Sequence, residues 1–131
     1  MKAFILGAFF LNTLVVYAQN DTTVYGYVNS TLIETELPPA FPGGPNMWKI
    51  YLEKKMQYPE TAKMNGIEGS VVVEFTVGKD GKISDIKIFK SADPELDKEA
   101  IRLIQKSMWL PALQGGKNVI YRKRQEIVFK I

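Results

Sequence analysis

The chain has 131 residues, a formal net charge of +3, no cysteine and no histidine. This length fits one domain, and so small an excess of basic residues lacks the concentrated basic face that nucleic-acid binding requires. Without cysteine or histidine, disulfides, thiolate chemistry, the commonest general base and the commonest metal ligand are excluded.

Residues 1–18 have the pattern of a secretory signal peptide. Lys2 precedes an apolar run, and Val16 and Ala18 stand three and one positions before a cleavage site ahead of Gln19. Polar residues interrupt the run, which is shorter than the ~20 residues that span a bilayer comfortably. We therefore predict export with cleavage of the leader; the alternative is an uncleaved leader that anchors the protein in the inner membrane.

Residues 19–40 are expected to form an extended or partly disordered lead-in, because they are polar, β-leaning and without a helical period. The β-leaning run Val24–Val28 would block the last strand of the domain if it folded back on it, which we do not expect. Prolines and glycines crowd residues 38–45, and the compact domain is predicted to span residues 41–131.

Two helices are predicted next. From Asn46 to Met56 the apolar side chains recur every three or four residues, which indicates an amphipathic helix whose aromatic residues belong to the core. Pro59 is suited to opening a second, short helix, and Gly66 to ending it in the left-handed conformation.

A strand and a hairpin follow. The apolar side chains of Val71, Val73, Phe75 and Val77 occupy every second position, with mostly more polar residues between them, which predicts a strand with one buried face. The Asp80-Gly81 pair favours a tight reversal into a second strand. Ile83 is out of phase with the apolar residues that follow it, which predicts a bulge just after the turn.

Asp93 and Pro94 predict the start of a third helix. Its apolar face is predicted to comprise Leu96, Ala100, Leu103 and Ile104. Its solvent face is predicted to comprise Asp97, Lys98, Glu99, Arg102 and Lys106. Pro111 ends the helical region, residues 114–118 form a turn, and the last strand is predicted from Tyr121 to Ile131.

The fold class is therefore α+β: a two-layer domain in which helices cover a three-stranded antiparallel sheet, with the element order α-α-β-β-α-β. No catalytic constellation accompanies it. The acidic residues 93–99 are explained by the positive end of a helix dipole, and the serines have no histidine to activate them. We predict that the protein is not an enzyme and has neither a metal site nor a cofactor.

The basic run Arg122-Lys123-Arg124 lies within the predicted last strand. One interpretation is that it grips an acidic partner, and the other is that its charges protect an exposed edge against aggregation. Both interpretations place the strand at the edge of the sheet, where a peptide can add as a new strand.

One set of residues between Phe41 and Ile131 has the order and spacing of a known family. They are Phe41-Pro42-Gly43-Gly44, Tyr58-Pro59, Ala62, Gly66-Ile67, Gly69, the Val71/Val73/Phe75/Val77 strand, Asp80-Gly81, Asp97 through Ala100, Trp109, Pro111-Ala112, Gly116-Lys117 and Phe129. From about Phe41 to Ile131 the chain thereby resembles the C-terminal domain of TonB, in the version found in small exported proteins of Bacteroidetes-type bacteria.

The resemblance implies a periplasmic protein-binding module that contacts TonB-dependent outer-membrane receptors. A receptor segment would pair as an added strand, and the module would take part in energy-coupled transport across the outer membrane. The implied contact residues are Gln57, Tyr58, Pro59, Arg122, Lys123, Arg124, Gln125, Glu126, Ile127 and Val128. For Tyr58 the alternative is that its ring only packs the domain.

The chain also departs from a full energy transducer of that family, which has an anchor containing a histidine and a long proline-rich spacer. The resemblance thus covers the receptor-binding part of such a transducer and not the part that couples it to the inner-membrane motor. The alternative function is a structural or interaction domain that binds other cell-envelope proteins without a role in transport. Neither nucleic acid nor a small-molecule substrate is expected, and exchange of the edge strand between two copies would give a homodimer.

Overall fold

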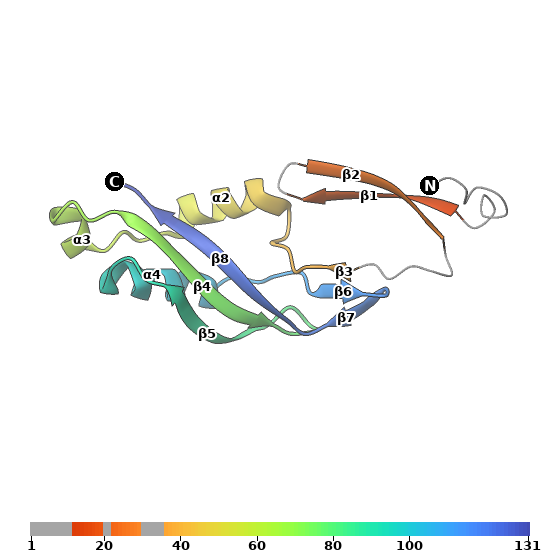
Figure 1. The fold of residues 1–131 in the computed structure, drawn as a ribbon. Coiled ribbons are helices and arrows are strands. Elements are labelled where there is room, and N and C mark those ends of the chain that lie inside the picture. The colour runs from red at the N-terminus through yellow and green to blue at the C-terminus, as the bar shows by residue number, and fades with distance from the viewer. Residues whose placement is uncertain (1–11, 20–21, 30–35) are drawn as a thin grey trace.

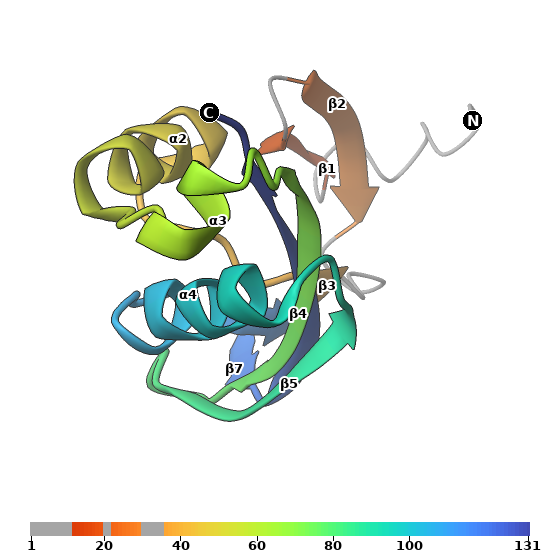
Figure 2. The ribbon, with the colours of Figure 1, turned by 90° about the vertical axis from the view of Figure 1, so that its left-hand side faces the viewer.

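The computed structural model describes residues 12–19, 22–29 and 36–131, and for the first two ranges it describes the backbone. The centre is an antiparallel sheet of β5 (Ile83–Lys90), β4 (Gly69–Val77) and β8 (Tyr121–Phe129), in that order. One face is covered by α2 (Gly44–Lys55), α3 (Glu60–Met64) and α4 (Pro94–Gln105) (Figure 1 and Figure 2). The α+β class and the order of these six elements confirm the prediction.

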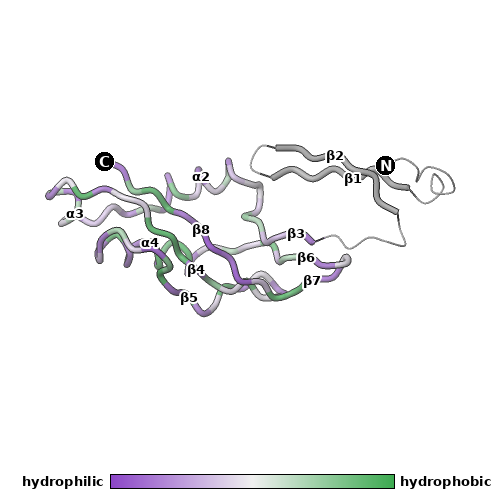
Figure 3. Tube along the Cα trace, in the orientation of Figure 1, coloured by the Kyte–Doolittle hydropathy of each residue, from purple (hydrophilic) through white to green (hydrophobic). Residues whose placement is uncertain are grey.

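The core lies between the sheet and the helices. Every second residue of β4 is fully buried, as its period of two predicted: Val71, Val73, Phe75 and Val77. α4 adds its predicted apolar stripe, which is Leu96, Ala100, Leu103 and Ile104, and β8 adds Ile127 and Phe129. Figure 3 shows β8 changing from hydrophilic along its charged run to hydrophobic toward its C-terminal end. Only that second half of β8 therefore contributes large apolar side chains to the core.

α4 begins as predicted, but one of its side chains does not lie where the pattern placed it. The Asp93 carboxylate accepts hydrogen bonds from the N–H groups of Glu95 and Leu96 at 2.9 and 3.4 Å. The prediction that Glu99 faces water is wrong, because this residue is only 7% exposed. Position 99 borders the apolar stripe, and the guanidinium of Arg102 covers its carboxylate, with Nε donating to Oε1 at 2.7 Å.

The β4–β5 hairpin reverses at Gly81, which has a φ of +85°. The pairing register then shifts between Glu74 and Thr76, opposite Asp85, whose φ is +48°. This confirms the predicted bulge. Because of it, Ile83 and Ile88 both lie opposite inward-facing residues of β4, although an odd number of positions separates them.

A second three-stranded sheet was not predicted. It contains β3 (Glu36–Leu37), β6 (Ala112–Gln114) and β7 (Lys117–Val119), in that order. The predicted turn at 114–118 is instead the β6–β7 hairpin, whose loop is Gly115-Gly116 with φ of +58° and +81°. Ala40 and Leu110 exchange N–H to O bonds of 3.2 and 2.8 Å. The end of the predicted lead-in is thus hydrogen-bonded to the domain.

Phe41 fixes the entry into α2 by packing among aromatic rings. Its ring centroid lies 5.2 Å from that of Trp48, 5.3 Å from that of Tyr51 and 5.7 Å from that of Trp109. Trp109 in turn lies 5.4 Å from Phe75 of β4. The aromatic stripe of α2 is therefore part of the core, as predicted.

The other described residues form a separate two-stranded sheet. β1 (Asn12–Gln19) pairs antiparallel with β2 (Thr22–Asn29), so Val24–Val28 pairs with β1 rather than with β8, as expected. Residues 1–11 of the predicted leader lie outside the described residues, and cleavage after Ala18 stays a prediction. Across the described ranges, no helix has the length and apolarity needed to cross a membrane.

We predict that Gly81→Ala destabilises the domain strongly. A Cβ at this position would lie 2.1 Å from the carbonyl oxygen of Trp109, in addition to the strain of a positive φ. Gly116→Ala is the matched control, since its φ is nearly the same and no atom lies within 4 Å of the added Cβ. Chemical denaturation should show a loss of about 1–2 kcal/mol for the control and clearly more for Gly81→Ala. Equal losses would contradict the contact with Trp109.

Candidate functional site

The outer edge of β8 is the regular edge of the central sheet. β8 pairs with β4 from Tyr121 opposite Val77 to Phe129 opposite Gly69, with no shift of register over its 9 residues. On its other side, no strand of the described residues pairs with it. A regular edge presents N–H and C=O groups at constant spacing, which is what an added strand needs.

The opposite edge of the sheet, formed by β5, is built differently. Its pairing with β4 shifts register twice, between Val72 and Val73 and between Glu74 and Thr76. Bulges of this kind bend the strand and interrupt the spacing of its backbone groups. Of the two edges, β8 is therefore the one suited to strand addition.

The side chain of Arg122 is held on the outer face of the sheet, away from the helices. Its Nε donates to Glu74 Oε2 at 2.9 Å, and one terminal nitrogen donates to Thr76 Oγ1 at 2.8 Å and to the carbonyl of Asp85 at 2.6 Å. The same nitrogen lies 3.1 Å from the Asp85 carboxylate. Arg122 thus ties β8 and β4 to the bulge of β5.

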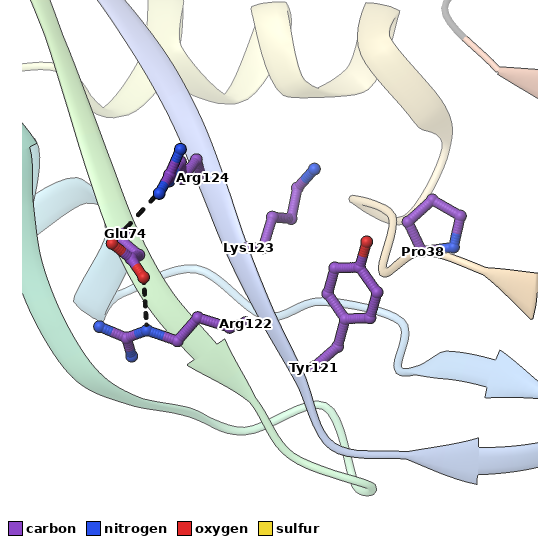
Figure 4. A pocket seen from close by; sticks show the side chains of 6 residues that line it. All are labelled: Pro38, Glu74, Tyr121, Arg122, Lys123 and Arg124. Atoms are coloured by element: carbon purple, nitrogen blue, oxygen red, sulfur yellow. Dashed lines mark hydrogen bonds and ion pairs between the residues drawn. The ribbon is translucent and has the colours of Figure 1, made fainter.

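Arg124 lies on the same face and is more exposed. Its guanidinium carbon lies 3.6 Å from the ring centroid of Phe89, and its Nε lies 3.9 Å from Glu74 Oε1. Glu74 therefore faces both arginines (Figure 4). The two arginines are thus paired with two carboxylates, those of Glu74 and Asp85.

Lys123 points to the other face of β8, toward the helices. Its Nζ lies 5.3 Å from the ring centroid of Trp109, and burial lowers its pKa from the ordinary 10.5. Within the described residues no carboxylate forms an ion pair with it. Figure 4 shows Lys123 and Tyr121 on the side of β8 that faces Pro38, opposite to Arg122 and Arg124. These residues and Glu74 line a depression of about 420 Å³ around the edge strand.

The remaining residues predicted on β8 divide by face. Glu126 and Val128 are exposed, Gln125 is half-buried, and Ile127 is fully buried in the core. A partner strand would therefore meet Ile127 through its main chain alone.

The predicted contact segment Gln57-Tyr58-Pro59 is firmly held between α2 and α3. The Gln57 N–H donates to Glu99 Oε2 at 2.7 Å, and Arg102 bridges from Glu99 to the carbonyl of Lys55 at 2.8 Å. This explains why Glu99 is buried, and its carboxylate raises the pKa of Arg102 through their hydrogen bond.

Tyr58 lies at the C-terminal end of β8. Its ring packs edge-on against Phe129 with centroids 5.9 Å apart, and its hydroxyl donates to the carbonyl of Ile67 at 2.5 Å. These contacts give the tyrosine a packing role, and its contact with a partner stays a prediction. Of the predicted site residues, Arg122–Val128 thus form the edge strand, Tyr58 lies at its C-terminal end and the depression at its N-terminal end, whereas Gln57 is held against α4.

Sequence reasoning missed three residues of this site: Pro38, Glu74 and Trp109. Glu74 is the only carboxylate among the outward-facing residues of β4, which was a usable signal once β4 is paired with a strand carrying arginines. Nothing in the pattern placed Pro38 or Trp109 beside Lys123. In the described part of the chain, no group of Asp and Glu side chains is arranged to hold a metal ion.

Comparison with known proteins identifies the relatives of this domain. A family model described as the Gram-negative bacterial TonB protein C-terminal matches residues 54–131. Protein TonB of Pseudomonas aeruginosa is 37% identical over 75 residues, which are 56% of this chain and 22% of that protein. Protein TonB of Haemophilus influenzae is 42% identical over 57 residues, which are 43% of this chain and 21% of that protein. The match thus spans about a fifth of these relatives.

Two solved structures show related chains. The solution structure of the Pseudomonas aeruginosa TonB C-terminal domain is 34% identical, with a TM-score of 0.47, and covers 59% of this chain and 82% of that one. A Helicobacter pylori TonB C-terminal domain is 24% identical, with a TM-score of 0.49, and covers 63% of this chain and 76% of that one.

We predict that Glu99→Ala destabilises the domain by about 2–3 kcal/mol, because it leaves the Gln57 N–H and the Arg102 guanidinium without their shared acceptor. Glu95→Ala is the control on the same helix, since Glu95 is exposed, and it should cost less than about 1 kcal/mol. Urea denaturation measures both losses. Equal stability of the two variants would show that Glu99 does not hold the 57–59 segment.

Lys123→Met should be more stable than the wild-type protein by an amount that depends on pH. Because the pKa of Lys123 is lowered in the folded state, its protonated form opposes folding. That penalty is complete below the folded-state pKa and fades as the pH rises from there through 10.5. The difference in stability between variant and wild type, followed by denaturation across this range, should therefore shrink as the pH rises. A difference that grows with pH would contradict the lowered pKa.

Proposed function

The chain belongs to the family of Gram-negative bacterial TonB C-terminal domains, and from this membership we propose that it is a periplasmic module that binds TonB-dependent outer-membrane receptors. A short extended segment of the receptor adds as a new strand beside β8. Through this contact the protein takes part in energy-coupled transport across the outer membrane. The family is one of interaction domains and energy transducers, not of enzymes, in agreement with the prediction from the sequence.

The observation that carries this proposal is the unbroken edge of β8. Its 9 residues keep one register with β4, so every second residue turns its N–H and C=O groups outward at regular spacing. A receptor segment that pairs with them gains affinity from main-chain hydrogen bonds, and its alternate side chains contact the two faces beside the strand. The bulged edge of β5 offers no equivalent run.

The ends of the edge limit where the segment lies. Tyr58 stands at the C-terminal end of β8, where it packs on Phe129. Pro38 and Tyr121 line the depression near its N-terminal end. A bound segment therefore runs along Arg122–Val128 between these two boundaries. Together with Gln57-Tyr58-Pro59, these are the contact residues that the family resemblance implies.

The test uses the purified protein and labelled peptides from the N-terminal segments of TonB-dependent receptors of the same organism. Binding is measured by fluorescence anisotropy. For peptides that bind, each backbone nitrogen is methylated in turn, because strand addition uses only every second N–H of the added strand. We expect methylation to abolish binding at alternate positions and to leave it nearly unchanged at the positions between them.

Proline variants of the protein test the same edge from the other side. Successive residues of β8 point their N–H groups alternately toward β4 and outward. Of the two variants Gln125→Pro and Glu126→Pro, one therefore removes a hydrogen bond to β4, and the other removes an N–H donor from the outer edge. The more stable variant should be the one that no longer binds. Binding that shows no period of two, or that survives in this variant, would overturn strand addition. No binding to any receptor peptide by the folded protein would instead favour a different cell-envelope partner.

A further inference from the structure

The three basic residues at the edge of β8 are not equivalent. Arg122 and Arg124 lie on the outer face, where the carboxylates of Glu74 and Asp85 match their charges at 2.9–3.9 Å. Arg122 also donates hydrogen bonds to Thr76 and to the backbone of Asp85. An acidic partner would have to compete with these built-in carboxylates for either arginine, and would gain little net charge interaction.

Lys123 has the opposite arrangement. It lies on the helix-facing side, half-buried above Trp109, with no carboxylate paired to it among the described residues. Desolvation without a counter-charge disfavours its protonated form, which the lowered pKa reflects. The ring of Trp109 compensates for this only in part. A carboxylate placed beside the ammonium would remove the deficit.

The geometry of strand addition brings a side chain to this place. In neighbouring antiparallel strands, directly opposite residues have Cβ atoms about 4.5–5.5 Å apart on the same face. The residue of an added strand opposite Lys123 therefore points its side chain to the helix-facing side. There Pro38, Tyr121 and Lys123 line one part of the depression of about 420 Å³, whose other part, on the outer face, is lined by Glu74, Arg122 and Arg124. An Asp or Glu side chain at this position reaches the Lys123 ammonium, whereas the residues before and after it point toward the outer face, where Arg122 and Arg124 already have carboxylate partners.

We propose that Lys123 is the specificity-determining residue of this edge and that the partner is an extended segment with one Asp or Glu opposite it. The requirement is for a single carboxylate in register, not for an acidic segment as a whole. This inference rests on the proposed function, because it needs a strand added to β8.

The experiment is a charge exchange at one peptide position. A receptor peptide that binds the protein is varied by placing Glu, Gln or Lys at each position in turn, and each variant is titrated against the wild-type protein and Lys123→Glu. For the wild type we expect one position where Glu binds about fivefold more tightly than Gln, and Lys more weakly than Gln. For Lys123→Glu the order at that position should reverse, and the order elsewhere should not change.

Two controls separate this effect from general electrostatics and from damage to the fold. Lys98→Glu changes the net charge equally at an exposed site on α4, and it should keep the wild-type preference at every position. Lys123→Met should fold with an unchanged or higher Tm and should lose the preference for Glu over Gln. A structural lysine would instead lower the Tm when replaced.

The outcomes also distinguish this inference from the proposed function. If the N-methyl series shows a period of two but Lys123→Glu keeps the wild-type order at every position, strand addition stands and the role of Lys123 is wrong. A preference for Glu spread over many positions and altered equally by Lys98→Glu would also overturn it. If no receptor peptide binds the folded protein, both proposals fall together.

Discussion

The arrangement of this domain depends on the continuous pairing of β4 with β8. β4 is the central strand, and all four of its inward-facing side chains are fully buried, so it needs a neighbour along each edge and a cover on its inner face. β5 is the nearer neighbour in sequence but pairs irregularly. The regular ladder comes from β8, which arrives from the far end of the chain and thereby leaves its own outer edge equally regular.

Local chemistry made much of this fold predictable. The alternation at Val71–Val77, the cap at Asp93 and the turn at Gly81 each act within a few residues, and the structure has all three where they were expected. The failures come from distant partners. From the sequence, Glu99 is expected to be exposed to solvent. It is buried because the Gln57 N–H, 42 positions away, and Arg102 both bind its carboxylate. β3 and β6 are too short to be recognised before they meet each other.

The candidate site shows the same division. Its position on the last strand was predictable, because a run of charged side chains is typical of an edge strand. The sequence did not predict which of its basic side chains lacks a carboxylate partner. Arg122 and Arg124 differ from Lys123 only because carboxylates of β4 and β5 lie on their face of the strand and Trp109 lies on the other face. The pairing between strands decides which basic side chains meet a carboxylate, and the spacing of residues in the sequence does not reveal that pairing.

The two interpretations of the basic run are therefore not exclusive, because they apply to different faces of one strand. An open edge must remain accessible to its partner without joining to other edges, and charged side chains discourage unwanted pairing. On the outer face the arginines serve the fold: Arg122 fixes the bulge at Asp85 that makes the other edge irregular. On the inner face Lys123, which has no carboxylate partner among the described residues, is proposed to make the same edge selective. In this proposal one short run of basic residues both stabilises the bulge at Asp85 on the β5 edge and assigns a charge requirement to the β8 edge.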